Sequence, residues 1–304
     1  MKHLDDSRIC ALVSLLSDDS KVVSQGARSA LKNIGAQALP YLADASNGPD
    51  ARLRVRARFV LEDVRIHLLE KRLFDIGHRL GKDQNALEDG CVLLALSRYP
   101  DLDEGSIRAA LDAMADDLQT RIVGVDHPMT VAQVLSRFLA GELGFSGNQR
   151  NYYDPDNSYL NRVLERRTGI PIALATIYLF VARRLSLPLF GIGLPGHFIL
   201  RLGLHEPAVF IDAFEAGRIQ TKADCIQRLS DGKGGYDPGL LMPMNDGAIL
   251  LRIIRNLQLV YRNLGELHQF RVLERLKKVL LREEVQRKDG GGHSSRGESN
   301  ALRP

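Results

Sequence analysis

The chain has 304 residues, of which 44% are hydrophobic and 26% are charged, and its formal net charge is +4. This balance is typical of a globular protein large enough for two domains, and it excludes a chain too polar to form a core, while so small a positive charge does not indicate a nucleic-acid-binding protein. The longest apolar run, residues 170–182, is too short to cross a bilayer, and three widely spaced cysteines, Cys10, Cys91 and Cys225, indicate reduced thiols in a cytoplasmic protein.

Helical patterns cover the first region, residues 1–82. Apolar side chains recur at helical spacing through residues 9–34, with Gly35 as the C-cap that ends the helix, and a long helix is predicted over residues 51–80. The run over residues 15–42 resembles one unit of a HEAT-type helical repeat, which predicts a helical cap or a partner-binding arm. Arginine occupies every second position of residues 52–58, which spreads charge around the helix and predicts a solvated surface. A nucleic-acid contact is the alternative, but no aromatic residues alternate with these arginines.

The second region, residues 83–228, is predicted to form one core. Helical patterns continue through residues 88–145. A turn-rich segment follows at residues 151–161, where Asn and Asp side chains are expected to satisfy backbone groups. This loop either lines a site or forms a rigid connection to the next helix. Its candidate binding residues are Asn157, Tyr159 and Asn161.

A helix is predicted over residues 172–185. Thr168 or Gly169 is expected to be its N-cap, and Pro171 fits the first helical turn, where a missing N–H has no cost. The helix is apolar on nearly every side, which predicts that it lies buried in the middle of a domain.

Three strands are predicted after this helix, over residues 189–194, 197–202 and 208–213. Gly196, just before the second strand, would let a ligand or another chain approach closely. A lone histidine in an apolar strand is more often structural than catalytic. His197 nevertheless has a possible carboxylate partner in Asp212 of the third strand.

The remaining residues divide into three segments after a short stretch that contains Cys225. A glycine-rich loop is predicted over residues 229–245, and its DGKGGY run lacks the spacing of a phosphate-binding loop. Residues 246–285 predict two helices with Gly265 at the turn between them, and the pattern resembles one tetratricopeptide repeat. The tail, residues 286–304, is rich in Gly, Ser and Arg and is predicted to be disordered.

Four segments closely resemble the transglutaminase-like superfamily: ALSRYPDLDE, ELGFSGNQRNYYDPDNSYLNRVLERRTGIPIALATIYLFVARRLSLPL, GIGLPGHFILR and FIDAFEAGR. More narrowly, they resemble the bacterial branch, sometimes called the invasion-regulator type, that joins such a core to tetratricopeptide-type helices. The resemblance implies a mostly helical α+β fold. In it, a transglutaminase-like (papain-like) core packs a central helix on a small antiparallel sheet, and HEAT-like and tetratricopeptide-like helices flank that core.

In active members of this superfamily a cysteine lies at the N-terminus of the central helix, where the helix dipole and a histidine favour the thiolate. The histidine lies on the following strand and an aspartate on the next, and His197 and Asp212 match these positions. Counted back from the end of the helix, the cysteine position falls at Pro171. Thr168, three residues upstream, and Cys225, beyond the aspartate strand, are not expected to replace the thiol.

Three functions are compatible with this reading. The first is a catalytically degenerate protein that binds a peptide or protein segment in the inherited cleft. The second is a hydrolase in which His197, oriented by Asp212, acts as general base on water, with backbone N–H groups near Gly169 stabilising the oxyanion. The third is an interaction protein in which the His-Asp pair only stabilises the sheet.

No cofactor or metal is predicted, because the eight histidines show neither HxxxH nor HExxH spacing. The first ten residues, MKHLDDSRIC, have no apolar run, which predicts no signal peptide. A protein or peptide partner is expected, without nucleic acid or membrane, and no pattern indicates an oligomeric state.

Overall fold

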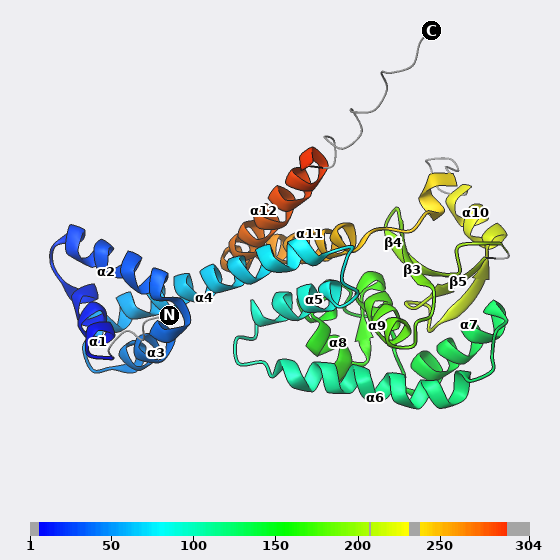
Figure 1. Cartoon of the computed structure of the whole chain (residues 1–304), viewed down its shortest axis with the longest axis horizontal. Helices are drawn as coiled ribbons and strands as arrows, with labels where there is room; N and C mark the ends of the chain where they lie inside the picture. The colour runs from blue at the N-terminus through cyan, green and yellow to red at the C-terminus, as the bar shows by residue number, and fades with distance from the viewer. Residues whose placement is uncertain (1–5, 207, 231–237, 291–304) are drawn as a thin grey trace, which may run out of the picture. The chain divides into compact units, whose positions relative to one another are not determined.

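The computed structural model describes residues 6–206, 208–230 and 238–290, with side chains up to Arg282 (Figure 1). The chain divides into two compact units, Met1–Asp75 and Ile76–Pro304. Within the described ranges, no helix combines the length and the hydropathy that crossing a bilayer requires.

The first unit is helical. Gly35 ends its second helix with φ at 72°, as the sequence predicts for a glycine C-cap. Leu31, Leu42 and Val64 are fully buried at its centre. Its elements are α1 (Asp6–Ser14), η1 (Leu15–Ser17), α2 (Lys21–Ile34), η2 (Gly35–Ala38), α3 (Leu39–Asn47) and the first part of α4 (Ala51–Arg79).

The sequence predicted a solvated surface for the alternating arginines at the start of α4, but three of them also donate to backbone carbonyls. Arg56 Nη1 donates to the carbonyls of Leu16 and Asp18 at 2.6 and 2.9 Å, and Arg58 Nε donates to the carbonyl of Ser46. Arg54 Nη1 likewise donates to the carbonyl of Gly48. The last carbonyls of a helix have no partner within it, so that guanidinium groups from α4 satisfy them.

The second unit surrounds one buried helix. Every residue of α9 (Pro171–Arg184) from Pro171 to Ala182 is buried, as its apolar circumference predicts. The strands β3 (Leu189–Leu194) and β4 (His197–Leu202) contact α9, as do several helices. The other helices are α5 (Ala86–Leu96), α6 (Glu104–Ile122), α7 (Pro128–Ser136), the π-helical η3 (Arg137–Glu142), η4 (Pro155–Asn157), α8 (Leu160–Arg166), α10 (Lys222–Ser230), η5 (Pro238–Leu241), α11 (Asp246–Leu264) and α12 (Leu267–Gly290).

A four-stranded antiparallel sheet packs against α9, which confirms the predicted small sheet. Its order is β3-β4-β5-β6, with β3 (Leu189–Leu194), β4 (His197–Leu202), β5 (Val209–Asp212) and β6 (Arg218–Thr221). The sequence did not predict β6 or α10, because RIQT is too short and too polar to show a strand pattern. Ile199 and Phe210 on one face of the sheet form an apolar cluster with Cys225 of α10.

The start of α9 differs from the predicted start. Ile170, with extended φ and ψ of −79° and 161°, precedes Pro171, the first helical residue, so that neither Thr168 nor Gly169 is the N-cap. Instead these two residues form β2 (Thr168–Gly169), which pairs in parallel with β1 (Ser146–Gly147). The extended residue before proline, whose α conformation is sterically disfavoured, explains the shift.

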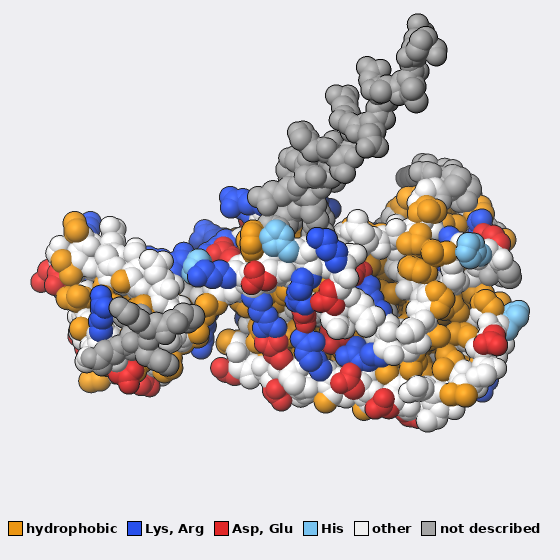
Figure 2. Space-filling model, viewed as in Figure 1, with side chains coloured by type: hydrophobic (Ala, Val, Ile, Leu, Met, Phe, Trp, Pro, Cys, Tyr) orange, Lys and Arg blue, Asp and Glu red, His pale blue; other side chains and the backbone are white. Residues whose placement is uncertain are grey.

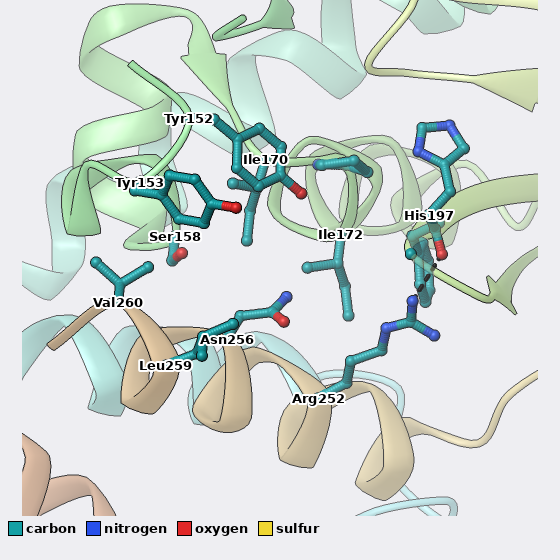
Figure 3. A pocket seen from close by; sticks show the side chains of 13 residues that line it. Tyr152, Tyr153, Ser158, Ile170, Ile172, His197, Arg252, Asn256, Leu259 and Val260 are labelled. Carbon is teal, nitrogen blue, oxygen red and sulfur yellow. Dashed lines mark hydrogen bonds between the residues drawn. The ribbon is translucent and has the colours of Figure 1, made fainter. Parts of the chain in front are cut away.

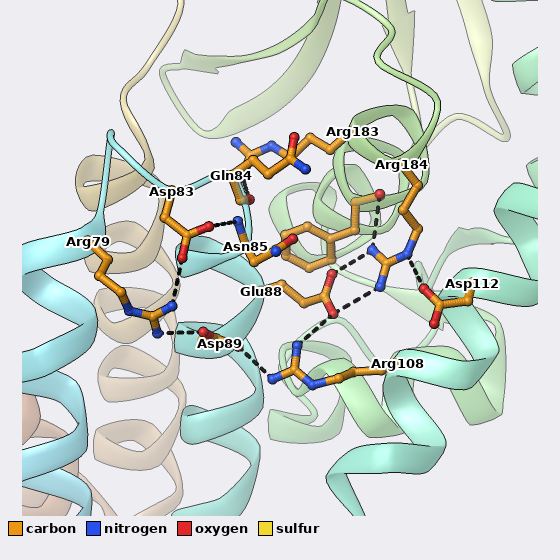
Figure 4. Close-up of polar contacts among 11 residues, drawn as sticks. Arg79, Asp83, Gln84, Asn85, Glu88, Asp89, Arg108, Asp112, Arg183 and Arg184 are labelled. Carbon is orange, nitrogen blue, oxygen red and sulfur yellow. Dashed lines mark hydrogen bonds and ion pairs between the residues drawn. The ribbon is translucent and has the colours of Figure 1, made fainter.

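An ion-pair network fixes the other end of α9 (Figure 4). Glu88 of α5, only 2% exposed, accepts hydrogen bonds from Arg184 of α9 at 2.6 Å and from Arg108 of α6 at 3.3 Å. Arg108 also reaches Asp89 at 2.6 Å, and Asp89 pairs with Arg79. Four helices are therefore joined by charges that the apolar pattern of α5 did not reveal.

Parts of the predicted loop and tail lie outside the described residues. Of the glycine-rich loop, 229–245, residues 231–237 are not described, and the end of α10 and η5 occupy part of the remainder. The predicted tail, 286–304, overlaps α12 up to Gly290, and its other residues are not described. Gly265 ends α11 in the left-handed conformation, with φ at 73°, where the sequence placed the turn.

Candidate functional site

His197 and Asp212 lie together, as the order of the strands predicts. His197 opens β4, Asp212 closes β5, and the antiparallel pairing of Leu200 with Ile211 brings these strand ends side by side. His197 Nε2 is 2.7 Å from Asp212 Oδ2. The Asp212 side chain is fully buried, whereas 19% of the His197 side chain is exposed. A buried carboxylate thus orients an accessible imidazole.

Three further groups donate to Asp212. Arg228 of α10 lies 3.0 Å from Oδ2, Gln220 of β6 lies 3.4 Å from it, and the backbone N–H of Glu215 donates to Oδ1. Burial by itself raises the pKa of the Asp212 carboxyl. The hydrogen bond and charge of His197, with the hydrogen bonds of Arg228 and Glu215, outweigh burial and hold this pKa below its usual value.

Asp212→Asn should lower the free energy of unfolding by about 2 kcal/mol at neutral pH, because His197 and Arg228 lose a buried ionic partner. A carboxyl whose pKa is lowered in the folded state stabilises the fold above its unfolded pKa of about 3.9, and that stability is lost as the pH falls through the folded value. The difference in the free energy of unfolding between Asp212→Asn and the parent should therefore be constant from about pH 5 to neutrality and shrink below about pH 4. Urea titrations at several pH values measure it, with the exposed Asp116→Asn as the control. A difference that grows with acidity would contradict this assignment.

A cleft with two lobes adjoins this pair. The first lobe, about 720 Å³, lies between the start of α9, the loop before η4 and one face of α11 (Figure 3). The second, about 710 Å³, includes Phe214, Glu215 and Arg228. The two lobes share four residues: Tyr152, Pro171, Gly196 and His197.

Pro171, where the resemblance to the superfamily predicted the cysteine position, lines both lobes of this cleft. None of the residues that line the two lobes is a cysteine. Cys225 of α10 is buried, its Sγ donates to Gln220, and burial raises the pKa of its thiol to about 11. Cys91 is buried in α5, and Cys10 belongs to the first unit. The site therefore has a histidine and a carboxylate without a thiol.

Of the predicted binding residues, Gly196 lines the cleft, with φ at +67°. The fully buried Asn157 donates through Nδ2 to the carbonyls of Asn151 and Tyr152, which holds the loop that carries Tyr152. Tyr159 is fully buried, and its hydroxyl lies 2.8 Å from that of Tyr261. The Oδ1 atom of Asn161 is buried without a hydrogen-bond partner. These last three residues do not line either lobe.

Sequence reasoning missed the wall contributed by α11. Arg252, Asn256, Leu259 and Val260 recur at i, i+4, i+7 and i+8, so they share one helical face, and all four line the first lobe. The spacing was available in the sequence, but nothing local indicated that this face meets α9. Within the described ranges, no group of three or more His, Cys, Asp or Glu side chains is placed to hold a metal ion.

Comparisons with known proteins agree with this architecture. Residues 105–255 match a family model described as the transglutaminase-like superfamily. A UPF0162 protein of Xylella fastidiosa is 40% identical over 179 residues, which are 57% of this chain and 63% of that protein. A UPF0162 protein of Pseudomonas aeruginosa is 28% identical over 62% of this chain and 69% of its own length.

F-box only protein 21 of mouse is 35% identical to this chain over 138 residues, which are 42% of this chain but only 20% of that protein. The match to the Xylella fastidiosa proteins covers less than two thirds of their length. No solved structure gives a significant match.

Proposed function

We infer that this chain, whose residues 105–255 match the transglutaminase-like superfamily, is a catalytically degenerate member that binds a peptide or protein segment in its two-lobed cleft. The observation that supports this most directly is Pro171, which lines both lobes next to the His197–Asp212 pair. Acyl transfer by this superfamily requires a nucleophile at that position, and proline has none. The cleft itself is retained.

The surroundings of the cleft suit a polypeptide ligand. Tyr152 and Tyr153 are 37% and 59% exposed, and Leu259 of α11 is 52% exposed, so that apolar side chains border the first lobe. Exposed apolar groups around a concavity mark interaction sites. On the face shown in Figure 2, by contrast, Lys and Arg side chains alternate with Asp and Glu over α5 and α6. Such mixing offers no extended basic surface for nucleic acid.

The flanking helices extend this proposal. We propose that α1–α4 form a HEAT-like arm and that α11 and α12 form a tetratricopeptide-like pair, as in the invasion-regulator branch. The support is that α11 and α12 pack closely and α11 lines the cleft. The matched segment also occurs in an F-box only protein of very different length, as expected for a module. The reduced cysteines support a cytoplasmic location.

A hydrolase of altered mechanism is the second candidate, and the intact bond between His197 and Asp212 favours it. Its weakness is the oxyanion site. Pro171 has no N–H, and the N–H of Ile170 donates to the carbonyl of Asn157 at 3.0 Å. Neither Pro171 nor Ile170 therefore provides a backbone donor for a developing negative charge.

One experiment separates the two candidates. The full chain is incubated with a pool of random synthetic peptides, and bound peptides are recovered and identified by mass spectrometry. We expect recovered peptides of unchanged mass, both from the parent and from His197→Gln. Pairs of fragments whose masses sum to that of an intact peptide plus one water, and that disappear with His197→Gln, would establish the hydrolase instead. A pool with no bound peptide would refute peptide binding.

A further inference from the structure

Arg252 brings an unneutralised positive charge into the first lobe. Its Nη2 donates to the carbonyls of Leu194 and His197, at 2.6 and 2.7 Å, on either side of the turn between β3 and β4. No carboxylate among the described side chains pairs with it, and Tyr152 is the titratable side chain that raises its pKa. Burial nevertheless lowers the pKa of Arg252. Both hydrogen bonds come from Nη2. The N–H groups of Nε and Nη1 therefore remain for a ligand.

A second polar group in this lobe lacks a partner. Ser158 is 6% exposed and lines the first lobe, and its buried Oγ has no hydrogen-bond partner in the structure. A buried hydroxyl without a partner costs free energy, so a ligand that supplies the missing hydrogen bond is favoured. Figure 3 shows Ser158 and Arg252 toward opposite ends of the lobe, with Asn256 between them.

The dimensions of the lobe limit what can lie between these groups. The lining face of α11 runs from Arg252 to Val260, which at 1.5 Å per residue is about 12 Å. An extended chain advances about 3.3 Å per residue, so three or four residues fit this length. Apart from Asn256, the wall between the polar ends includes the apolar side chains of Ile170, Ile172 and Leu259.

We propose that the first lobe binds the free C-terminus of a peptide, with its terminal carboxylate at Arg252, its apolar last side chain against Ile170 and Ile172, and its preceding backbone at Ser158. A C-terminal apolar residue presents a carboxylate and an apolar side chain from a single Cα, which matches a cation placed beside an apolar wall. Guanidinium–carboxylate hydrogen bonds are among the strongest polar contacts in proteins. This proposal rests on the proposed function and specifies its ligand.

Fluorescence polarisation with the full chain tests it. Two pools of labelled tetrapeptides, identical except for a free acid or an amide at the C-terminus, are titrated with protein. We expect the acid pool to bind about 10- to 100-fold more tightly, because the amide cannot accept charge-assisted hydrogen bonds from Arg252. Arg252→Gln should abolish most of this preference, and its matched control, Arg255→Gln on the exposed side of the same helix, should preserve it.

Arg252 also holds the β3–β4 turn, so a second variant avoids that role. Leu259→Asp changes a residue of the lobe that is already 52% exposed, and its carboxylate should repel the acid pool selectively, by about tenfold. Leu264→Asp, 53% exposed on α11 but outside the lobe, is its control.

The outcomes separate the two levels of the proposal. Acid and amide pools that bind equally, both weakened by Leu259→Asp, would leave peptide binding intact and overturn the C-terminal assignment. An amidated pool ending in Glu that binds as tightly as the acid pool would also overturn it, in favour of an acidic side chain. If neither pool binds, the proposed function fails as well.

Discussion

Pro171→Cys should create a thiol with an unusually low pKa. Position 171 is the first residue of α9 and lines both lobes with His197. The N-terminus of a helix and a neighbouring histidine each stabilise a thiolate, and together they lower a cysteine pKa from about 8.5 to values near 6.5. At about pH 6 the lower pKa strongly raises the fraction of the thiol that is ionised. A thiolate of lower pKa is also a weaker nucleophile, so the net effect should be alkylation roughly tenfold faster than for an ordinary thiol.

The measurement is the alkylation rate as a function of pH, followed by mass spectrometry of the modified peptides. Cys10, exposed in α1 of the same chain, provides the internal reference. Adding His197→Gln to Pro171→Cys should move the midpoint of the profile back toward higher pH. A midpoint at or above that of an ordinary thiol would mean that position 171 is not an activated nucleophile position, and the ancestry of the cleft would lose its main support.

Glu88→Ala should destabilise the second unit by about 3 kcal/mol. The Glu88 carboxylate is 2% exposed and is shared by Arg184 and Arg108, so its removal leaves two guanidinium groups with fewer partners and opens a cavity. Arg184 keeps Asp112 and Arg108 keeps Asp89, which places the cost at the lower end of the range for a broken buried ion pair.

Tyrosine fluorescence in urea measures this loss selectively, because the chain has no tryptophan and every tyrosine except Tyr41 lies in Ile76–Pro304. Glu88→Gln, which keeps the shape of the side chain, separates the loss of charge from the loss of packing. Asp116→Ala, an exposed acid on α6, should change the free energy of unfolding by less than about 0.5 kcal/mol. A Glu88→Ala variant as stable as Asp116→Ala would show that the network contributes no net stability.

Much of the fold followed from local patterns. The apolar circumference of α9 predicted its burial, and the glycines Gly35 and Gly265 marked helix ends correctly. The errors occurred where local signals are weak. β6 is short and polar, and the residues before Pro171 pair as β2 only because β1 lies beside them.

The candidate site was predictable only in part. His197 and Asp212 could be paired from strand order, because consecutive antiparallel strands are neighbours. The burial of Tyr159 against Tyr261 could not be predicted, since the two residues belong to segments far apart in the chain. The charge of Arg252 was overlooked for the same reason. Its significance depends on which side chains surround it and not on its own helix.

By itself, the sequence determined the order of a buried helix, a histidine strand and an aspartate strand, and its resemblance to the superfamily predicted that a proline occupies the cysteine position. These features are local, since hydrophobic period and residue identity are properties of the chain itself. Only the tertiary structure decided that α11 forms a wall of the cleft and brings Arg252 and Ser158 into one lobe. Packing between distant segments, which no local pattern encodes, sets both the shape of that lobe and its charge.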